Sequence, residues 1–132
     1  MRAAGVIVKH KNLVLLAKRI TSYKGRPVSY GGYWSIFAGS REPPSEPPRL
    51  CAARELFEET GIKIKPSDLR FCKTIYKGKG MLDLFYYDFE EIPNVKLNFE
   101  HTESGWFDID LLKSFPYEID PPIVKAIEMT NK

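Results

Sequence analysis

Three glutamates between residues 55 and 59 have the spacing of ligands for a divalent cation. At about 100° per residue, a helix over Leu50–Gly61 puts Glu55, Glu58 and Glu59 on one face, within roughly 100° of one another. Carboxylates at this spacing repel each other, and two of them lie near the negative end of the helix dipole. A hard cation such as Mg²⁺ would offset the repulsion, because it prefers carboxylate and water oxygens together with substrate phosphates. The spacing therefore favours a metal site, although a solvated acidic face would show the same pattern.

The other positions of this helix predict how it packs and where it ends. Arg54 is one i,i+4 step from Glu58 and is expected to hold that carboxylate in place. Gly61 is expected to end the helix in the left-handed conformation. Four side chains that fall away from the glutamates form the expected buried stripe: Leu50, Ala53, Leu56 and Phe57.

The elements that must position this helix are strands separated by loops and turns. We expect an N-terminal hairpin, and we expect a second hairpin whose turn is Lys77-Gly78-Lys79-Gly80. Residues 20–32 are expected to form a long surface loop, and residues 39–48 a loop rich in Gly, Ser and Pro. The expected strands are Ala3–Lys9, Asn12–Lys18, Tyr33–Phe37, Leu69–Tyr76, Met81–Phe89 and Gly105–Ile109, and the expected helices are Pro48–Thr60, a turn at Asp110–Ser114 and Pro121–Met129.

Composition and charge limit the function classes. The 132 residues suit one domain, and no apolar run is long enough to cross a membrane, so we expect a cytoplasmic protein. The two cysteines, Cys51 and Cys72, match no metal or redox spacing and are expected to be reduced thiols. Residues 1–40 carry seven Lys or Arg and no Asp or Glu, which favours a polyanionic ligand. Signatures of nucleic-acid-binding modules are missing from the sequence, which disfavours that class.

Residues 40–62 resemble the Nudix box, whose pattern is Gly, five residues, Glu, seven residues, Arg-Glu, aliphatic, any residue, Glu-Glu, any residue, Gly, aliphatic. The positions in register are Glu46, Arg54, Glu55, Leu56, Glu58, Glu59, Gly61 and Ile62. The chain departs from the pattern at the opening glycine, where Ser40 follows Gly39, and in the prolines on both sides of Glu46. The resemblance implies an α/β/α sandwich with a mixed β-sheet, as one domain over residues 1–132.

The same resemblance implies an activity and a set of site residues. The expected activity is metal-dependent hydrolysis of a phosphoanhydride bond in a nucleoside triphosphate or another nucleoside diphosphate-linked substrate. Glu55, Glu58 and Glu59 would bind Mg²⁺ or Mn²⁺, with Glu46 as a further or indirect ligand, and Arg54 would orient the cluster. Candidates for the general base, in order, are Glu100, His101 and Glu103, and a glutamate of the box is a further alternative.

Substrate contacts are expected from the N-terminal third of the chain. Basic side chains would bind phosphates, an aromatic ring would stack on a base, and the turn before the box would border the substrate. The expected residues are Lys18, Arg19, Arg26, Tyr33, Gly39 and Ser40.

The partners implied by the resemblance remain a set of alternatives. The small nucleotide-like substrate is a nucleoside triphosphate, a nucleotide sugar, a dinucleoside polyphosphate or a capped RNA end. Family members that act on oxidised guanine nucleotides use an asparagine just before the terminal helix, whereas this chain has Ile119-Asp120-Pro121, which disfavours that substrate. A catalytically silent nucleotide sensor is the alternative to an enzyme. Homodimers are frequent among similar proteins, so a homodimer is included among the expectations.

Overall fold

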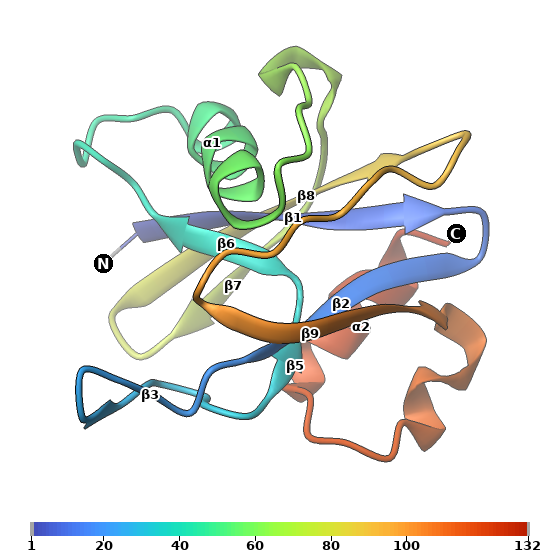
Figure 1. The fold of residues 1–132 in the computed structure, drawn as a ribbon. Coiled ribbons are helices and arrows are strands. Elements are labelled where there is room, and N and C mark those ends of the chain that lie inside the picture. The colour runs from blue at the N-terminus through green and yellow to red at the C-terminus, as the bar shows by residue number, and fades with distance from the viewer. Residues whose placement is uncertain (1, 132) are drawn as a thin grey trace.

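A mixed β-sheet with one α-helix on each face makes up the protein in the computed structural model, which describes residues 2–131 (Figure 1). The main path through the sheet is β5-β2-β1-β8-β7, with β6 paired to β1 and β9 paired to β2. Only the β1–β8 pair is parallel among the described strands. The predicted α/β/α sandwich with a mixed sheet is confirmed.

The elements follow the predicted order. The main strands are β1 (Arg2–His10), β2 (Leu13–Arg19), β5 (Trp34–Ser35), β6 (Phe37–Ser40), β7 (Arg70–Lys77), β8 (Gly80–Asp88) and β9 (His101–Asp108). The helices are α1 (Pro48–Thr60) and α2 (Pro121–Met129), with short 3₁₀ turns η1 (Pro66–Asp68) and η2 (Ile109–Ser114). Both predicted hairpins and both predicted α-helices are confirmed.

Alternation along β1 divides the core between the two faces of the sheet. Val6 and Val8 point to the α1 side, whereas Ile7 points to the α2 side, as the period of two in a strand requires. Each of these side chains is fully buried. The six consecutive buried residues of β1 therefore reflect a strand covered on both faces.

The sequence-based prediction missed three details of the strands. Loop 20–32 contains a two-stranded ladder, β3 (Ser22–Tyr23) with β4 (Arg26–Pro27). The strand expected over 33–37 is divided, because β5 pairs with β2 whereas β6 pairs with β1 and continues to Ser40. Strand β9 begins at His101 rather than at Gly105, because His101, Glu103 and Ser104 also pair with β2.

Helix α1 is rotated relative to the predicted face. Leu50 and Phe57 are 48% and 46% exposed, so half of the predicted buried stripe is wrong. The side facing the sheet carries Cys51, Ala52 and Leu56, each fully buried. Small residues at two of these positions let the helix lie close to the sheet, and this rotation turns two of the glutamates inward.

A glycine ends helix α1, and two prolines stand at its beginning. As predicted, Gly61 ends α1 in the left-handed conformation, with φ 76°. Its N–H donates to the carbonyl of Phe57 at 2.8 Å. Pro47 and Pro48 begin α1, and no side chain within residues 2–131 caps it. No helix of the described chain is long and apolar enough to cross a membrane.

Candidate functional site

Two glutamates of α1 are buried between the helix and the sheet. Glu59 is fully buried, and both of its carboxylate oxygens lack a hydrogen-bond partner among the described residues. Burial raises the pKa of Glu59 strongly, and the nearby charges of Glu100 and Glu55 raise it further. Burial also raises the pKa of Glu55, which is 8% exposed. The unpartnered carboxyl group of Glu59 needs a proton or a cation to compensate its burial.

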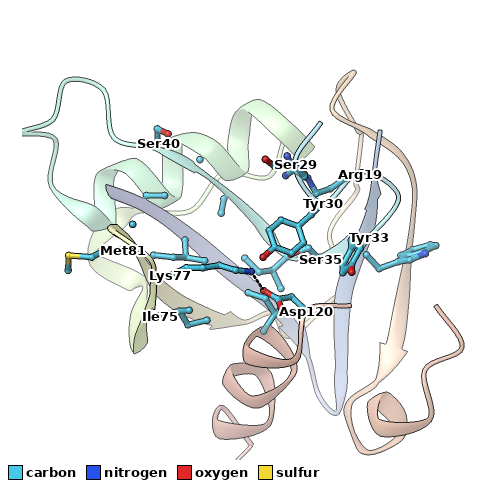
Figure 2. Close-up of a pocket in the computed structure, with 18 residues that line it drawn as sticks. Arg19, Ser29, Tyr30, Tyr33, Ser35, Ser40, Ile75, Lys77, Met81 and Asp120 are labelled. Atoms are coloured by element: carbon cyan, nitrogen blue, oxygen red, sulfur yellow. Dashed lines mark hydrogen bonds and ion pairs between the residues drawn. The ribbon is translucent and has the colours of Figure 1, made fainter. Parts of the chain in front are cut away.

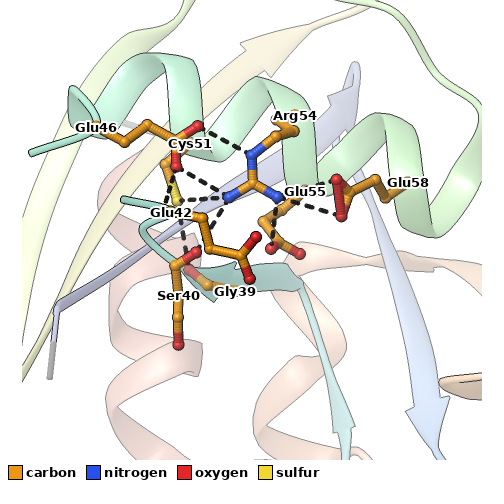
Figure 3. Close-up of polar contacts among 8 residues, drawn as sticks. All are labelled: Gly39, Ser40, Glu42, Glu46, Cys51, Arg54, Glu55 and Glu58. Atoms are coloured by element: carbon orange, nitrogen blue, oxygen red, sulfur yellow. Dashed lines mark hydrogen bonds and ion pairs between the residues drawn. The ribbon is translucent and has the colours of Figure 1, made fainter. Parts of the chain in front are cut away.

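Arg54 binds the other glutamates of the helix and its preceding loop (Figure 3). Its guanidinium donates to both oxygens of Glu46, each at 2.9 Å, and to both oxygens of Glu58, at 2.9 and 3.2 Å. The same Nη1 nitrogen that contacts Glu58 also donates to Glu55 at 3.1 Å. We call Arg54 with Glu46, Glu55 and Glu58 the Arg54 cluster. The predicted i,i+4 contact of Arg54 with Glu58 is confirmed, and its bidentate contact with Glu46 was not predicted.

The Glu46 carboxylate is buried and hydrogen-bonded within the Arg54 cluster. Its side chain is 5% exposed, and it also accepts a hydrogen bond from the backbone N–H of Glu42 at 2.8 Å. Hydrogen bonds from Arg54 lower the pKa of Glu46 to about 2. Glu46 is therefore ionised at neutral pH, and its position suits the orientation of Arg54 more than direct metal binding.

Gly39 leaves room for the Glu55 carboxylate. A Cβ atom built at Gly39 would overlap the carboxylate carbon and both oxygens of Glu55. The next residue also contacts the cluster, because the backbone carbonyl of Ser40 accepts a hydrogen bond from Arg54 at 3.1 Å. Gly39 precedes the position at which the sequence motif would carry its glycine, and it lies directly against the Glu55 carboxylate.

We expect Gly39→Ala to lower kcat/KM for hydrolysis by about tenfold or more, because the new methyl group must displace Glu55. Steady-state kinetics on the variant, on Glu55→Gln and on the double variant would measure this effect. Since Gly39→Ala acts by moving Glu55, its effect should shrink sharply when Glu55 is already replaced. Additive effects of the two substitutions would contradict the assignment.

The inward glutamates fit a divalent cation. The observation that supports this fit is the pair of buried, unpartnered oxygens on Glu59, beside a second buried carboxyl on Glu55. Glu58 lies outside this pair, because its half-exposed carboxylate is turned to Arg54. Within residues 2–131, no three side chains of His, Cys, Asp or Glu converge on one point. Completing a three-glutamate site therefore requires Glu58 to rotate away from Arg54.

The three candidates for the general base lie in different surroundings. The segment before β9 is tied to α1, since the N–H of Asn98 donates to the Glu59 carbonyl at 3.1 Å, and Asn98 Oδ1 accepts from the N–H of Glu100 at 3.0 Å. Glu100 is half-buried and close enough for its charge to raise the pKa of Glu59. Glu103 is exposed on β9, opposite Lys18.

His101 is buried beside Glu59. Its side chain is fully buried, with Nε2 at 3.8 Å from Oε1 of Glu59 and its ring against the edge of Phe37. Burial lowers the pKa of His101 to about 4, so the ring is neutral at pH 7. This location suits the positioning of Glu59 better than contact with an attacking water.

A cavity of about 420 Å³ opens on the α2 side of the sheet (Figure 2). Four of the six predicted substrate-contact residues line it: Arg19, Tyr33, Gly39 and Ser40. Lys18 and Arg26 lie outside its lining, and Arg26 is exposed on β4. Gly39 lies between the cavity and the Arg54 cluster, because it lines the cavity and contacts Glu55.

Sequence reasoning did not identify Lys77 as a site residue, and it considered Asp120 only as evidence against an oxidised guanine nucleotide. Their side chains form an ion pair of 3.0 Å at the cavity, and Lys77 Nζ lies 3.9 Å from the ring centre of Tyr30. The sequence indicated Lys77 only as a turn residue. Residues 77 and 120 come together because α2 packs on β7, a long-range contact without a local pattern.

Comparison with known proteins shows which family and which fold the chain is similar to. A model of the NUDIX domain family matches residues 1–127. An RNA pyrophosphohydrolase of Bartonella quintana is 34% identical over 91 residues, which cover 68% of this chain and 46% of that protein. The NAD-capped RNA hydrolase NudC of Chromobacterium violaceum is 29% identical over 114 residues, which cover 86% of this chain and 40% of that protein.

The solved structures add evidence on the fold. The crystal structure of a MutT NUDIX hydrolase from Burkholderia pseudomallei superposes with a TM-score of 0.75 at 20% identity. The superposition covers 97% of this chain and 95% of that one. By contrast, the chain spans only part of the length of the curated relatives it matches, from 29% to 59%.

Proposed function

The chain belongs to the NUDIX domain family, and from this premise we propose that it hydrolyses a phosphoanhydride bond in a nucleotide with the help of a divalent cation. The substrate class is a nucleoside triphosphate or another nucleoside diphosphate-linked compound. The observation that carries this proposal is the fully buried Glu59, whose two oxygens have no partner in the described chain and which lies beside Glu55 on the family's helix.

Glu55 and Glu59 would hold the cation, Mg²⁺ or Mn²⁺, and Glu58 would join them after leaving Arg54. When bound, the cation supplies charge neutralisation to the phosphates and lowers the pKa of a water. Arg54 then keeps its two contacts to Glu46, which fix the guanidinium beside the helix. Glu46 is thus proposed to act through Arg54. His101, with Nε2 at 3.8 Å from Oε1 of Glu59, is proposed to restrict the position of the Glu59 carboxyl by packing beside it.

Glu100 is proposed as the general base. A water oxygen attacks phosphorus, the anhydride P–O bond breaks, and the leaving phosphate departs with the bond's electron pair. Glu100 accepts the proton that the attacking water loses. Its half-buried position near Glu59 supports this role, whereas Glu103 is exposed and His101 is enclosed. Arg19, at the junction of cavity and cluster, would contact a phosphate.

We expect Glu100→Gln to lower kcat by about a hundredfold or more, since removal of a general base typically costs that much. Glu103→Gln is the matched control, because it removes a carboxylate from the same segment at an exposed position. Steady-state turnover of both variants under saturating Mg²⁺ gives the comparison. Turnover of Glu100→Gln near that of the wild-type protein would reject Glu100 as the base.

A panel of nucleotides incubated with Mg²⁺ or Mn²⁺, with separation of the products, tests the proposed function itself. The panel contains nucleoside triphosphates, nucleotide sugars, dinucleoside polyphosphates and RNA with a triphosphate or capped 5′ end. Cleavage of at least one compound supports an enzyme. If every compound stays intact, and Glu58→Gln alters only ligand binding, the protein is a nucleotide sensor instead.

A further inference from the structure

Two exposed aromatic rings lie against each other next to the segment of the proposed base. The ring centres of Tyr23 and Phe99 are 5.1 Å apart, and the rings are inclined to each other by 31°. The two residues are 47% and 60% exposed, and both lie outside the two core clusters. We call Tyr23 and Phe99 the aromatic pair. Packing of the core therefore does not account for this contact between two large apolar side chains at the surface.

Tyr23 is carried by a short hairpin that projects from the protein (Figure 1). Lys24 and Gly25 join β3 to β4, with φ angles of 51° and 77°. Positive φ at both central residues is what the two-residue turn needs for its twist to match that of the strands. The base of the hairpin is closed, because the N–H of Val28 donates to the Thr21 carbonyl at 3.1 Å. The hairpin therefore holds Tyr23 in a defined position near its tip.

Backbone hydrogen bonds connect the aromatic pair to the proposed active site. Phe99 immediately precedes Glu100, the proposed base. The Glu100 carbonyl accepts from the N–H of Ile20 at 3.0 Å, at the start of the loop that carries the hairpin. One residue before Phe99, the N–H of Asn98 donates to the Glu59 carbonyl at 3.1 Å. The aromatic pair is not part of the cavity lining, so it forms a separate surface next to the proposed base.

The tip of the hairpin is basic. Lys24 Nζ lies 5.4 Å from the ring centre of Tyr23, and Arg26, which is exposed, pairs with Tyr23 across the hairpin. Residues 20–32 contain no Asp or Glu. Two cations beside exposed rings, in a loop without acidic residues, favour an anionic ligand that also contains flat rings.

We propose that the aromatic pair, Lys24 and Arg26 bind the single-stranded RNA chain that follows a 5′ phosphoanhydride. One base stacks on the aromatic pair, and the phosphodiester groups that follow it contact the two cations. Aromatic rings together with basic side chains are how proteins bind single-stranded nucleic acid without reading its sequence. The inference rests on the proposed function, since it names the part of the substrate that extends away from the cleaved bond. The sequence shows no signature of an RNA-binding module, because the two rings come from distant segments of the chain.

The place of the cations distinguishes an RNA chain from a small compound with two nucleosides. Lys24 and Arg26 lie at the turn of the hairpin, at the opposite end from the hydrogen bond between Ile20 and Glu100. In a polyphosphate that links two nucleosides, every phosphate lies between them, on the side of the glutamates. In RNA, a phosphate also follows the stacked base. The cations at the turn therefore match the phosphates of an RNA chain.

Fluorescence anisotropy of a 3′-labelled, 5′-monophosphorylated hexaadenylate in EDTA tests the inference. This RNA contains no phosphoanhydride bond, so its binding does not depend on hydrolysis. Unlabelled 5′-monophosphorylated hexaadenylate is expected to compete at least about tenfold more strongly than AMP. Tyr23→Ala and Phe99→Ala should each weaken RNA binding by about fivefold or more, because base stacking is lost. Tyr23→Phe should bind as the wild-type protein does, because it keeps the ring.

The salt dependence of binding tests the two cations. Replacing both, as Lys24→Gln with Arg26→Gln, should reduce the slope of log affinity against log salt concentration by about 1.4, since each phosphate contact on a single strand contributes about 0.7. Tyr23→Ala should weaken binding with little change in this slope. The two kinds of variant therefore separate stacking from charge.

Two control variants, Phe71→Ala and Lys79→Gln, remove an exposed aromatic ring and an exposed cation elsewhere, and both should bind RNA as the wild-type protein does. Equal competition by hexaadenylate and AMP, or unchanged RNA affinity in Tyr23→Ala, would overturn the inference. Stronger competition by diadenosine tetraphosphate than by the RNA would overturn it as well, in favour of a small compound with two nucleosides. The nucleotide panel judges hydrolysis separately, so RNA binding and catalysis can fail independently.

Discussion

Glu59→Gln is expected to reduce hydrolysis by about a hundredfold or more while leaving the metal-free protein at least as stable as the wild type. The loss of activity follows because a proposed cation ligand worth several kcal/mol of transition-state stabilisation is removed. The stability follows because a neutral amide replaces a fully buried carboxyl group of similar shape. Initial rates and thermal unfolding in EDTA measure the two effects.

Thermal unfolding with added Mg²⁺ separates metal binding from folding in this variant. The wild-type protein should gain thermal stability from Mg²⁺, because a ligand that binds the native state stabilises it, whereas Glu59→Gln should gain much less. Glu91→Gln, at an exposed position, is the matched control and should behave as the wild type. An active Glu59→Gln variant would remove Glu59 from the proposed site.

Arg54→Met is expected to lower the free energy of unfolding by about 3 kcal/mol, because it leaves the buried carboxylate of Glu46 without its bidentate partner. Urea unfolding at pH 7 measures the loss. The variant should also lose activity, since Arg54 no longer holds the carboxylate of Glu55. An unfolding free energy within about 0.5 kcal/mol of the wild type would contradict the role of this contact.

A double-mutant cycle with Glu46→Gln isolates the contact between the two side chains. Once Glu46 is neutral, Arg54→Met should cost much less than it does alone. The pH dependence has a definite sign. Because the pKa of Glu46 is lowered to about 2 in the folded protein, its contribution is present above the ordinary pKa and is lost as the pH falls towards 2. The stability difference between the wild type and Glu46→Gln should therefore shrink over that acid range.

The family helix and its end were predictable because their determinants are local. The spacing of Glu55, Glu58 and Glu59 and the glycine at position 61 define the helix and its stop. Its rotation was not predictable in the same way. Cys51 and Ala52 are small, and only the packing against the sheet shows that this side, and not Leu50 with Phe57, faces inward.

The parts of the site that sequence reasoning missed depend on long-range contacts. Lys77 and Asp120 are 43 positions apart and meet through the packing of α2 on β7. Gly39 was predicted as a substrate contact, but its closeness to Glu55 depends on how β6 lies under α1. Glu100, His101 and Glu103 were predicted only as candidates for the general base, and the burial of His101 beside Glu59 depends on the pairing of β9 with β2.

The most direct test of the central claim is product analysis of the wild-type protein with GTP, first with Mg²⁺, then with excess EDTA, and then with Mg²⁺ restored. Anion-exchange chromatography separates the nucleotide products and reports which anhydride bond is cleaved. Cleavage that proceeds with Mg²⁺, stops in EDTA and resumes on restoration is the predicted result. Cleavage that continues unchanged in EDTA, or GTP that stays intact together with every other nucleotide of the panel, would contradict metal-assisted phosphoanhydride hydrolysis.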